Sequence, residues 1–215
     1  MRNLIPLIIL LTIFSCNSNT TQEEAKHSKP LTNPCEAGRD IINIKTVFAK
    51  DTASFPTQRL YSVIDFIQGK GLFKPHADNT DKLKIKKEFG KTFTIVYDTC
   101  DHIRWIEKNF ILTNINISAV EFKASRPDKY TGLTPGLHLE EWKFTNNSDR
   151  DSAMSVVETA YRSPGNITMY EKRYSQFVID DERIFLLETG AKFAEPYAIE
   201  YKKLIERFIR INNKH

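Results

Sequence analysis

An apolar run at the N-terminus constrains this chain most. It spans residues Leu4–Phe14 and follows a single cation, Arg2. Eleven residues are too few to cross a bilayer as a helix, which needs about 20. A positive start, a short apolar stretch and a small residue before the processing point are typical of a secretory signal peptide. We therefore predict that residues 1–15 are removed and take no part in the fold.

The end of this run, Ile13-Phe14-Ser15-Cys16, resembles the lipobox of bacterial lipoproteins, in which a small residue precedes a cysteine. The Phe-Ser-Cys ending is similar to lipoproteins of the Bacteroidetes in particular. Many lipoboxes have a small residue where this chain has Phe14, so a plain signal peptide cut elsewhere and a short uncleaved anchor are the alternatives. The resemblance implies that Cys16 becomes the first mature residue and carries acyl chains such as palmitate. Two or more acyl chains anchor a protein stably.

The resemblance also implies a location in the bacterial cell envelope. The lipid on Cys16 would hold the protein on a membrane, facing the periplasm or the cell surface. The sequence does not distinguish the inner membrane from the outer membrane. Residues 16–34 carry only one large apolar side chain, Leu31, which predicts a lipidated, flexible tether. Residues 35–215 are predicted to form one globular domain.

Composition is ordinary for a globular protein, with 40% hydrophobic and 27% charged residues. The formal net charge of +4 is too small an excess to suggest nucleic acid as a partner. A protein or glycan partner is left open.

Three cysteines are present. If Cys16 carries lipid, Cys35 and Cys100 remain as a pair in a compartment where disulfides persist. A disulfide that closes the long loop between Cys35 and Cys100 would stabilise the fold by roughly 4 kcal/mol in the chain-entropy model. We expect a Cys35–Cys100 disulfide, and two free buried thiols are the alternative.

Alternating or β-branched apolar residues predict strands along much of the chain. We expect a turn at Gly90-Lys91, between two paired strands. Within Phe110–Phe122 the alternation changes phase between Ala119 and Val120, which suggests a bulge or bend. The predicted strands are Ile41–Phe48, Lys82–Lys86, Phe93–Tyr97, Phe110–Phe122, Leu137–Phe144, Ile167–Ile179 and Ile184–Thr189.

Three segments have apolar residues at helical spacing. The first follows Pro56 and ends near Gly69, the second follows Ser148 and ends before Pro164, and the third begins at Pro196. A mainly antiparallel sheet with about three helices packed on one side of it makes the predicted fold class α+β.

The common catalytic motifs do not occur, so isolated ionisable groups are the only candidates. His138 and Glu140 are two apart on a predicted strand and therefore share a face. They are weak candidates for metal ligands or a general base, since catalytic zinc sites keep three protein ligands. No cofactor is predicted. Cys100 and His102 could form a nucleophile and its base, but a bridged sulfur cannot attack.

Aromatic side chains on one face could stack on sugars, and Trp142, Tyr130 and Tyr170 are the candidates for such a surface. Trp142 recurs with Phe144 at strand spacing, which favours a position in the core.

The interpretation that follows is a lipid-anchored, non-enzymatic binding or accessory protein outside the cytoplasm. A small metal-dependent or hydrolytic enzyme that uses His138 and Glu140 is the first alternative, and an immunity-type lipoprotein is the second. Catalytic residues, ligand and oligomeric state are not predicted.

Overall fold

The structure is a computed structural model that describes residues 22–24, 37–51, 55–68, 70, 73–75, 83–99, 104–162, 174–190 and 194–213. Cys16, Cys35 and Cys100 lie outside these ranges, as does the predicted signal peptide, so the lipid and the disulfide stay predictions. None of the helices in the described ranges combines the length and the apolar composition that a membrane span requires.

Eight strands and three helices make up the described part of the chain. The strands are β1 (Gln22–Glu24), β2 (Gly38–Val47), β3 (Phe73–Pro75), β4 (Ile85–Thr99), β5 (Arg104–Ala124), β6 (Gly136–Lys143), β7 (Tyr174–Asp180) and β8 (Arg183–Thr189). The helices are α1 (Gln58–Gln68), α2 (Asn147–Arg162) and α4 (Glu195–Asn212). The α+β prediction is confirmed.

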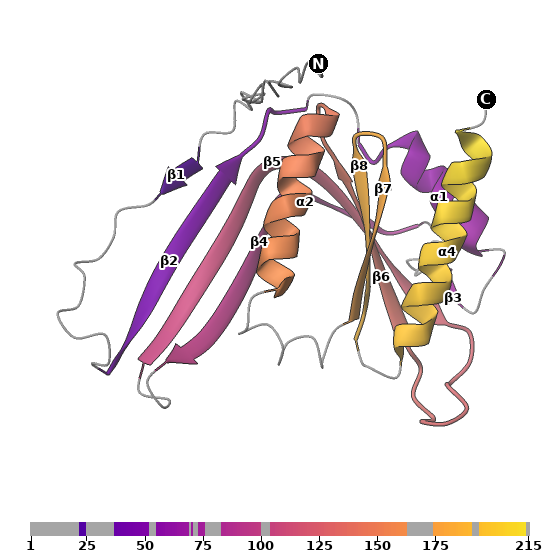
Figure 1. Cartoon of the computed structure of the whole chain (residues 1–215). Coiled ribbons are helices and arrows are strands. Elements are labelled where there is room, and N and C mark those ends of the chain that lie inside the picture. Colours follow the sequence, from indigo (N-terminus) through magenta and orange to yellow (C-terminus); the bar gives the residue numbers. More distant parts are fainter. Residues whose placement is uncertain are drawn as a thin grey trace, which may run out of the picture.

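The strands form one sheet in the order β1-β2-β5-β6-β8-β7, with β3 and β4 also paired with β5 (Figure 1). Every pair is antiparallel except β2–β5, which is parallel. β1 lies inside the predicted tether and pairs with β2. Residues 16–34 are therefore not wholly without secondary structure, because the open edge of β2 accepts this short strand.

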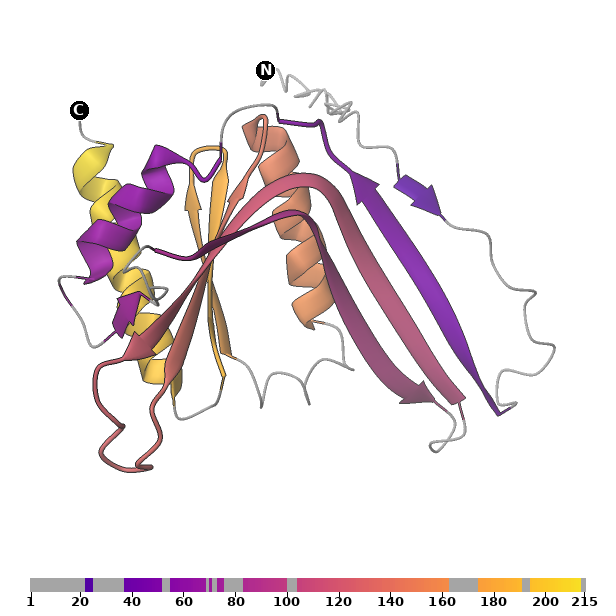
Figure 2. The same cartoon turned by 180° about the vertical axis from the view of Figure 1, so that it is seen from behind.

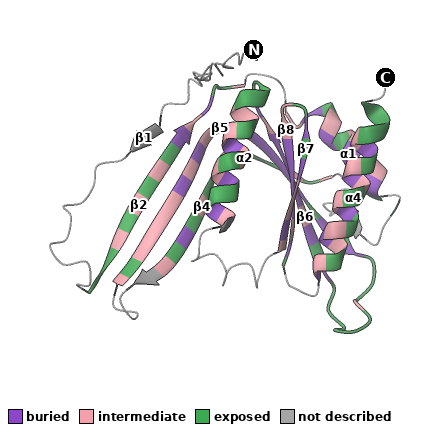
Figure 3. Cartoon of the chain, viewed as in Figure 1, coloured by how far each residue is buried: buried purple, intermediate pink, exposed green. Residues whose placement is uncertain are grey.

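The helices cover both faces of the sheet, and the prediction that they pack on one side is wrong. α4 packs on β7 and β8 beside α1, whereas α2 contacts β4, β5 and β8 from the other side (Figures 1 and 2). Both faces of β6 and β8 are consequently buried, as the purple bands in Figure 3 show. The outer strand β2 is more exposed.

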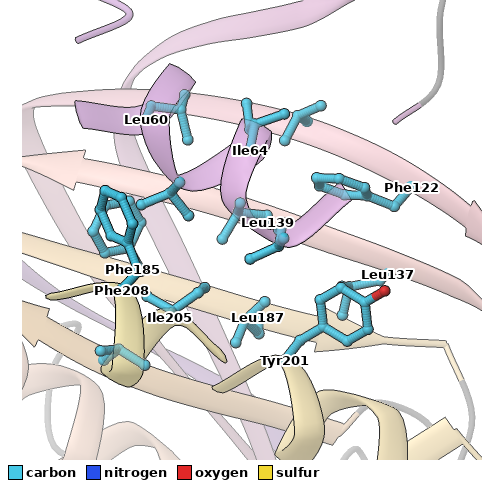
Figure 4. Close-up of a cluster of buried hydrophobic side chains, with 14 of the residues drawn as sticks. Leu60, Ile64, Phe122, Leu137, Leu139, Phe185, Leu187, Tyr201, Ile205 and Phe208 are labelled. Atoms are coloured by element: carbon cyan, nitrogen blue, oxygen red, sulfur yellow. The ribbon is translucent and has the colours of Figure 1, made fainter. Parts of the chain in front are cut away.

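Each covered face has its own core. Under α1 and α4, the apolar side of α1 is buried through Leu60, Val63, Ile64 and Ile67. Figure 4 shows Leu60 and Ile64 in this core. Under α2, the core is built around Trp142, which is 0% exposed and packs among side chains of β5, β8 and α2. The prediction that Trp142 belongs to the core is confirmed.

The long strands β4 and β5 bend together (Figure 2). Asn114 of β5 has a left-handed φ of 64°, and the register of β4 shifts between Glu88 and Gly90. A Cβ at position 90 would lie 2.5 Å from the carbonyl oxygen of Leu112, so this close approach requires glycine. The predicted turn at Gly90-Lys91 is wrong, because β4 continues through it as one bulged strand.

The change of phase between Ala119 and Val120 has a different cause from a bulge. Ser118, Ala119 and Val120 are consecutive in β5, and all three are buried. Because cores lie on both faces of the sheet here, apolar residues are required on both sides of the strand.

Two polar contacts fix α1 to the sheet. The Thr57 hydroxyl accepts the Leu60 N–H at 3.2 Å, as a helix N-cap does, and donates to Glu141 Oε1 at 2.6 Å. Arg59 donates from Nε and Nη2 to the two oxygens of Asp180 at 2.6 and 3.0 Å. The helix is thereby joined to β6 and β7.

Candidate functional site

Strand β6 places His138 and Glu140 on the same face as Trp142, because alternate side chains of a strand point to the same side. The register sets His138 opposite Glu121 of β5 and opposite Glu188 of β8. A row of ionisable side chains therefore crosses three neighbouring strands. The structure brings together the two candidates that the sequence suggested and adds partners from distant segments.

His138 lies between two carboxylates. Its Nδ1 is 2.7 Å from Glu121 Oε1, and its Nε2 is 2.7 Å from Glu140 Oε1. Burial alone would lower the pKa of His138, but the hydrogen bonds and negative charges of Glu140 and Glu121 outweigh it and raise the pKa above its usual value.

Glu140 is 3% exposed, and three side chains contact its carboxylate. The Trp142 indole N–H donates to Oε2 at 2.6 Å, and the Lys91 ammonium donates to Oε1, the oxygen that also contacts His138. Burial would raise the pKa of Glu140, but His138, Lys91 and Trp142 together lower it to about 2. Glu140 is therefore a buried, ionised carboxylate.

Glu188 completes a group of three. The Ser175 hydroxyl of β7 and the Tyr161 hydroxyl of α2 donate to its Oε1 at 3.2 and 3.4 Å. One ligand atom each from His138, Glu140 and Glu188 lies within 4.8 Å of the other two. Sequence reasoning missed Glu188, because only the pairing of β6 with β8 brings it to His138.

A cavity of about 440 Å³ opens beside these three residues. Eight of the described residues line it: Lys91, Glu121, Gly136, His138, Glu140, Glu188, Thr189 and Gly190. A smaller hollow of about 140 Å³ shares Glu121 and His138 and extends to Lys84 and Lys86. Two lysines of the predicted strand Lys82–Lys86 therefore border the site.

The charges of the site favour a cation. Glu121, Glu140 and Glu188 supply three carboxylates around His138, and Lys91 is the cation that lines the larger cavity with them. Imidazole nitrogen and carboxylate oxygen are ligands that zinc takes. For acid–base chemistry His138 is better placed than Glu140, because a pKa of about 2 makes a weak base at neutral pH.

Several other ionisable and aromatic residues lie away from this site or outside the described residues. Glu141 points to the opposite face and contacts Thr57. Asp98 pairs with Trp105 near the far end of β4, about 23 Å along the strand from Lys91, and Cys100 and His102 are outside the described residues. Trp142 is buried, so it offers no face for a sugar to stack on.

Comparison with protein families, with curated proteins and with solved structures finds no match. The function is therefore argued from the geometry of the site.

Proposed function

We propose that this protein is a lipid-anchored, non-enzymatic binding protein of the bacterial envelope, and that its ligand occupies the cavity beside His138, Glu140 and Glu188. The observation that carries the proposal is Glu140, a buried and ionised carboxylate at the wall of an open cavity. A buried charge is costly unless it is paired, and the partners of Glu140, Lys91 and His138, line the same cavity, so a charged ligand can exchange contacts with them.

The lining of the cavity favours a small charged ligand. Five of its eight residues are ionisable, and they carry both signs of charge. The described apolar residues on this face pack beneath α2 instead. A ligand there would exchange ion pairs with the wall rather than fill an apolar pocket.

A binding experiment tests this part of the proposal. Full-length protein is purified gently in detergent, and native mass spectrometry records any small molecule that remains bound. We expect a bound species in the wild type that is lost in Glu140→Gln and kept in Glu206→Gln, which changes an exposed carboxylate of α4. Equal occupancy in all three proteins would rule out the cavity as the binding site.

The anchor is supported by the lipobox-like ending at Cys16. Cells grown with a palmitate analogue should label the wild type and the Cys35→Ser control but not Cys16→Ser. Persistent labelling of Cys16→Ser would exclude lipidation at this residue.

A hydrolytic enzyme is the second candidate, and the raised pKa of His138 between two carboxylates favours it. In that case His138 would transfer protons and the cavity would hold the substrate. Any hydrolase activity found for the purified protein should be lost in His138→Ala. An activity that survives this change belongs to a contaminant or to another site.

A further inference from the structure

We infer that His138, Glu140 and Glu188 bind a divalent transition-metal ion of the zinc type, with one coordination position open to the cavity. The inference rests on the proposed function in one respect, the location of the ligand, and it names the chemical class of that ligand.

The three candidate ligand atoms are close to the spacing that zinc requires. Bonds of 2.0–2.2 Å in tetrahedral geometry put ligand atoms about 3.3 Å apart. His138 Nε2 and Glu140 Oε1 are 2.7 Å apart, and all three ligand atoms lie within 4.8 Å of one another. Adjustments of about 1.5 Å or less between the ligand atoms would seat the ion. The ion would take the place of the proton shared by His138 and Glu140.

Each ligand already has an orienting partner on the side away from the ion. Glu121 contacts the other ring nitrogen of His138, Nδ1, at 2.7 Å, which is the carboxylate–histidine arrangement found behind metal-binding histidines.

The two carboxylates are oriented in the same way. Trp142 holds the second oxygen of Glu140, and Ser175 holds one oxygen of Glu188 at 3.2 Å. One ligand atom from each of the three residues lies within 4.8 Å of the other two.

The donor types select the class of ion. One imidazole and two carboxylates suit zinc and its first-row neighbours, whereas calcium takes six to eight oxygen ligands. Three protein ligands leave a position free, and the cavity of about 440 Å³ lies beside it. Water or a second small ligand would occupy that position.

Lys91 is the competing cation. Its ammonium contacts Glu140 Oε1, the oxygen that the ion would use. Its side chain is 20% exposed and lines the cavity, so it can move toward solvent when the ion binds. The metal therefore brings two positive charges and displaces two, the Lys91 ammonium and the proton between His138 and Glu140.

The test is a zinc titration of full-length protein in detergent, after treatment with a chelator and in competition with a chromophoric chelator. We expect one zinc ion per chain. Affinity should fall about 10- to 100-fold in Glu121→Gln, the range for loss of an orienting partner, and by more in Glu188→Gln. Affinity should rise in Lys91→Met and be unchanged in Glu206→Gln.

Thermal unfolding of each variant without zinc separates loss of the site from loss of the fold. Zinc binding that is equal in Glu188→Gln and the wild type, or no binding by a folded wild type, would overturn the metal inference. The proposed function fails separately. If the folded protein binds no zinc but holds another molecule, and Glu140→Gln abolishes that binding, the metal inference is wrong and the proposed ligand site in the cavity stands.

Discussion

The indole N–H of Trp142 donates to Glu140 Oε2 across 2.6 Å, so the largest side chain of one core is also a support of the candidate site. Stability and binding are joined at this contact.

Trp142→Phe tests that joint role. The ring stays in the core, but the donor to an ionised carboxylate is lost, and hydrogen bonds to charged groups contribute about 1.5–3 kcal/mol. We expect the free energy of unfolding in urea to fall by at least that amount. A double-mutant cycle with Glu140→Ala, which removes the acceptor, separates the hydrogen bond from the change in ring volume. An equal loss in both backgrounds would show that the contact contributes nothing.

The metal-free protein should be most stable at mildly acidic pH. Glu140, whose pKa is lowered from 4.5 to about 2, stabilises the fold above pH 4.5, and this is lost as the pH falls toward 2. His138, whose pKa is raised from 6.5, stabilises the fold below pH 6.5, and this is lost as the pH rises through its folded pKa.

Both contributions are therefore present between pH 4.5 and 6.5, and the Glu140 shift corresponds to about 3 kcal/mol. Urea unfolding across this range and beyond it measures the curve. His138→Gln should flatten the decline above pH 6.5. If His138→Gln loses as much stability above pH 6.5 as the wild type, groups other than His138 cause that loss.

Asp180→Asn should destabilise the protein strongly. The Asp180 side chain is 0% exposed and is paired with Arg59, so the change leaves a part-buried guanidinium without its counter-charge. Breaking one partner of a buried ion pair costs about 3–5 kcal/mol.

The matched control for Asp180→Asn is Glu206→Gln in the Lys202–Glu206 pair of α4, whose charged atoms are 3.9 Å apart at the surface. This change should cost no more than about 0.5 kcal/mol. Chemical denaturation of both variants makes the comparison, and similar losses would contradict the assigned role of Asp180.

Gly90→Ala should disturb both the fold and the site. The new Cβ would meet the Leu112 carbonyl oxygen at 2.5 Å, and overpacking of this kind costs about 1–3 kcal/mol. Because Lys91 follows directly, its contact with Glu140 should also shift. Gly38→Ala is the control, since a Cβ there has no neighbour within 4 Å. Equal melting temperatures for the two variants would exclude the bulge as a constraint.

The predicted Cys35–Cys100 disulfide stays a prediction, and a chemical test is available. Gly38 of β2 and Thr99 of β4 both pair with Arg104 of β5, so the described chain on either side of the two cysteines meets at one end of the sheet. Neighbouring strands are about 4.8 Å apart, which puts these strand ends roughly 10 Å from each other. Alkylation of the unfolded protein should modify both thiols only after reduction. Modification without a reductant would exclude the bridge.

Local patterns in the sequence predict the helices well. The stripe of Leu60, Val63, Ile64 and Ile67 is buried as its spacing indicates, and α1 and α2 end near Gly69 and Pro164, where breakers stand. Likewise, strand alternation predicts that His138 and Glu140 share a face, and they do.

Features that depend on tertiary contacts could not be predicted in this way. Glycine is common in turns, and only the close approach of the Leu112 carbonyl shows that Gly90 belongs to a bulged strand. Glu188 has no local mark of function, because the register of β6 with β8 alone brings it to His138. Pairing between distant strands is set by the whole fold, so no window of sequence contains it.

Strand β5 also determines how this chain must fold. It is hydrogen-bonded to β2, β3, β4 and β6, and β2 reaches it from 66 positions earlier in the chain. Such pairing raises the contact order. A high contact order slows folding, because the entropy of closing a long loop is lost before the strand pair forms its contacts. β2 therefore has no partner for its long edge until β5 is in place. The pairs β4–β5 and β7–β8 close short loops and should form first, with β2 added later.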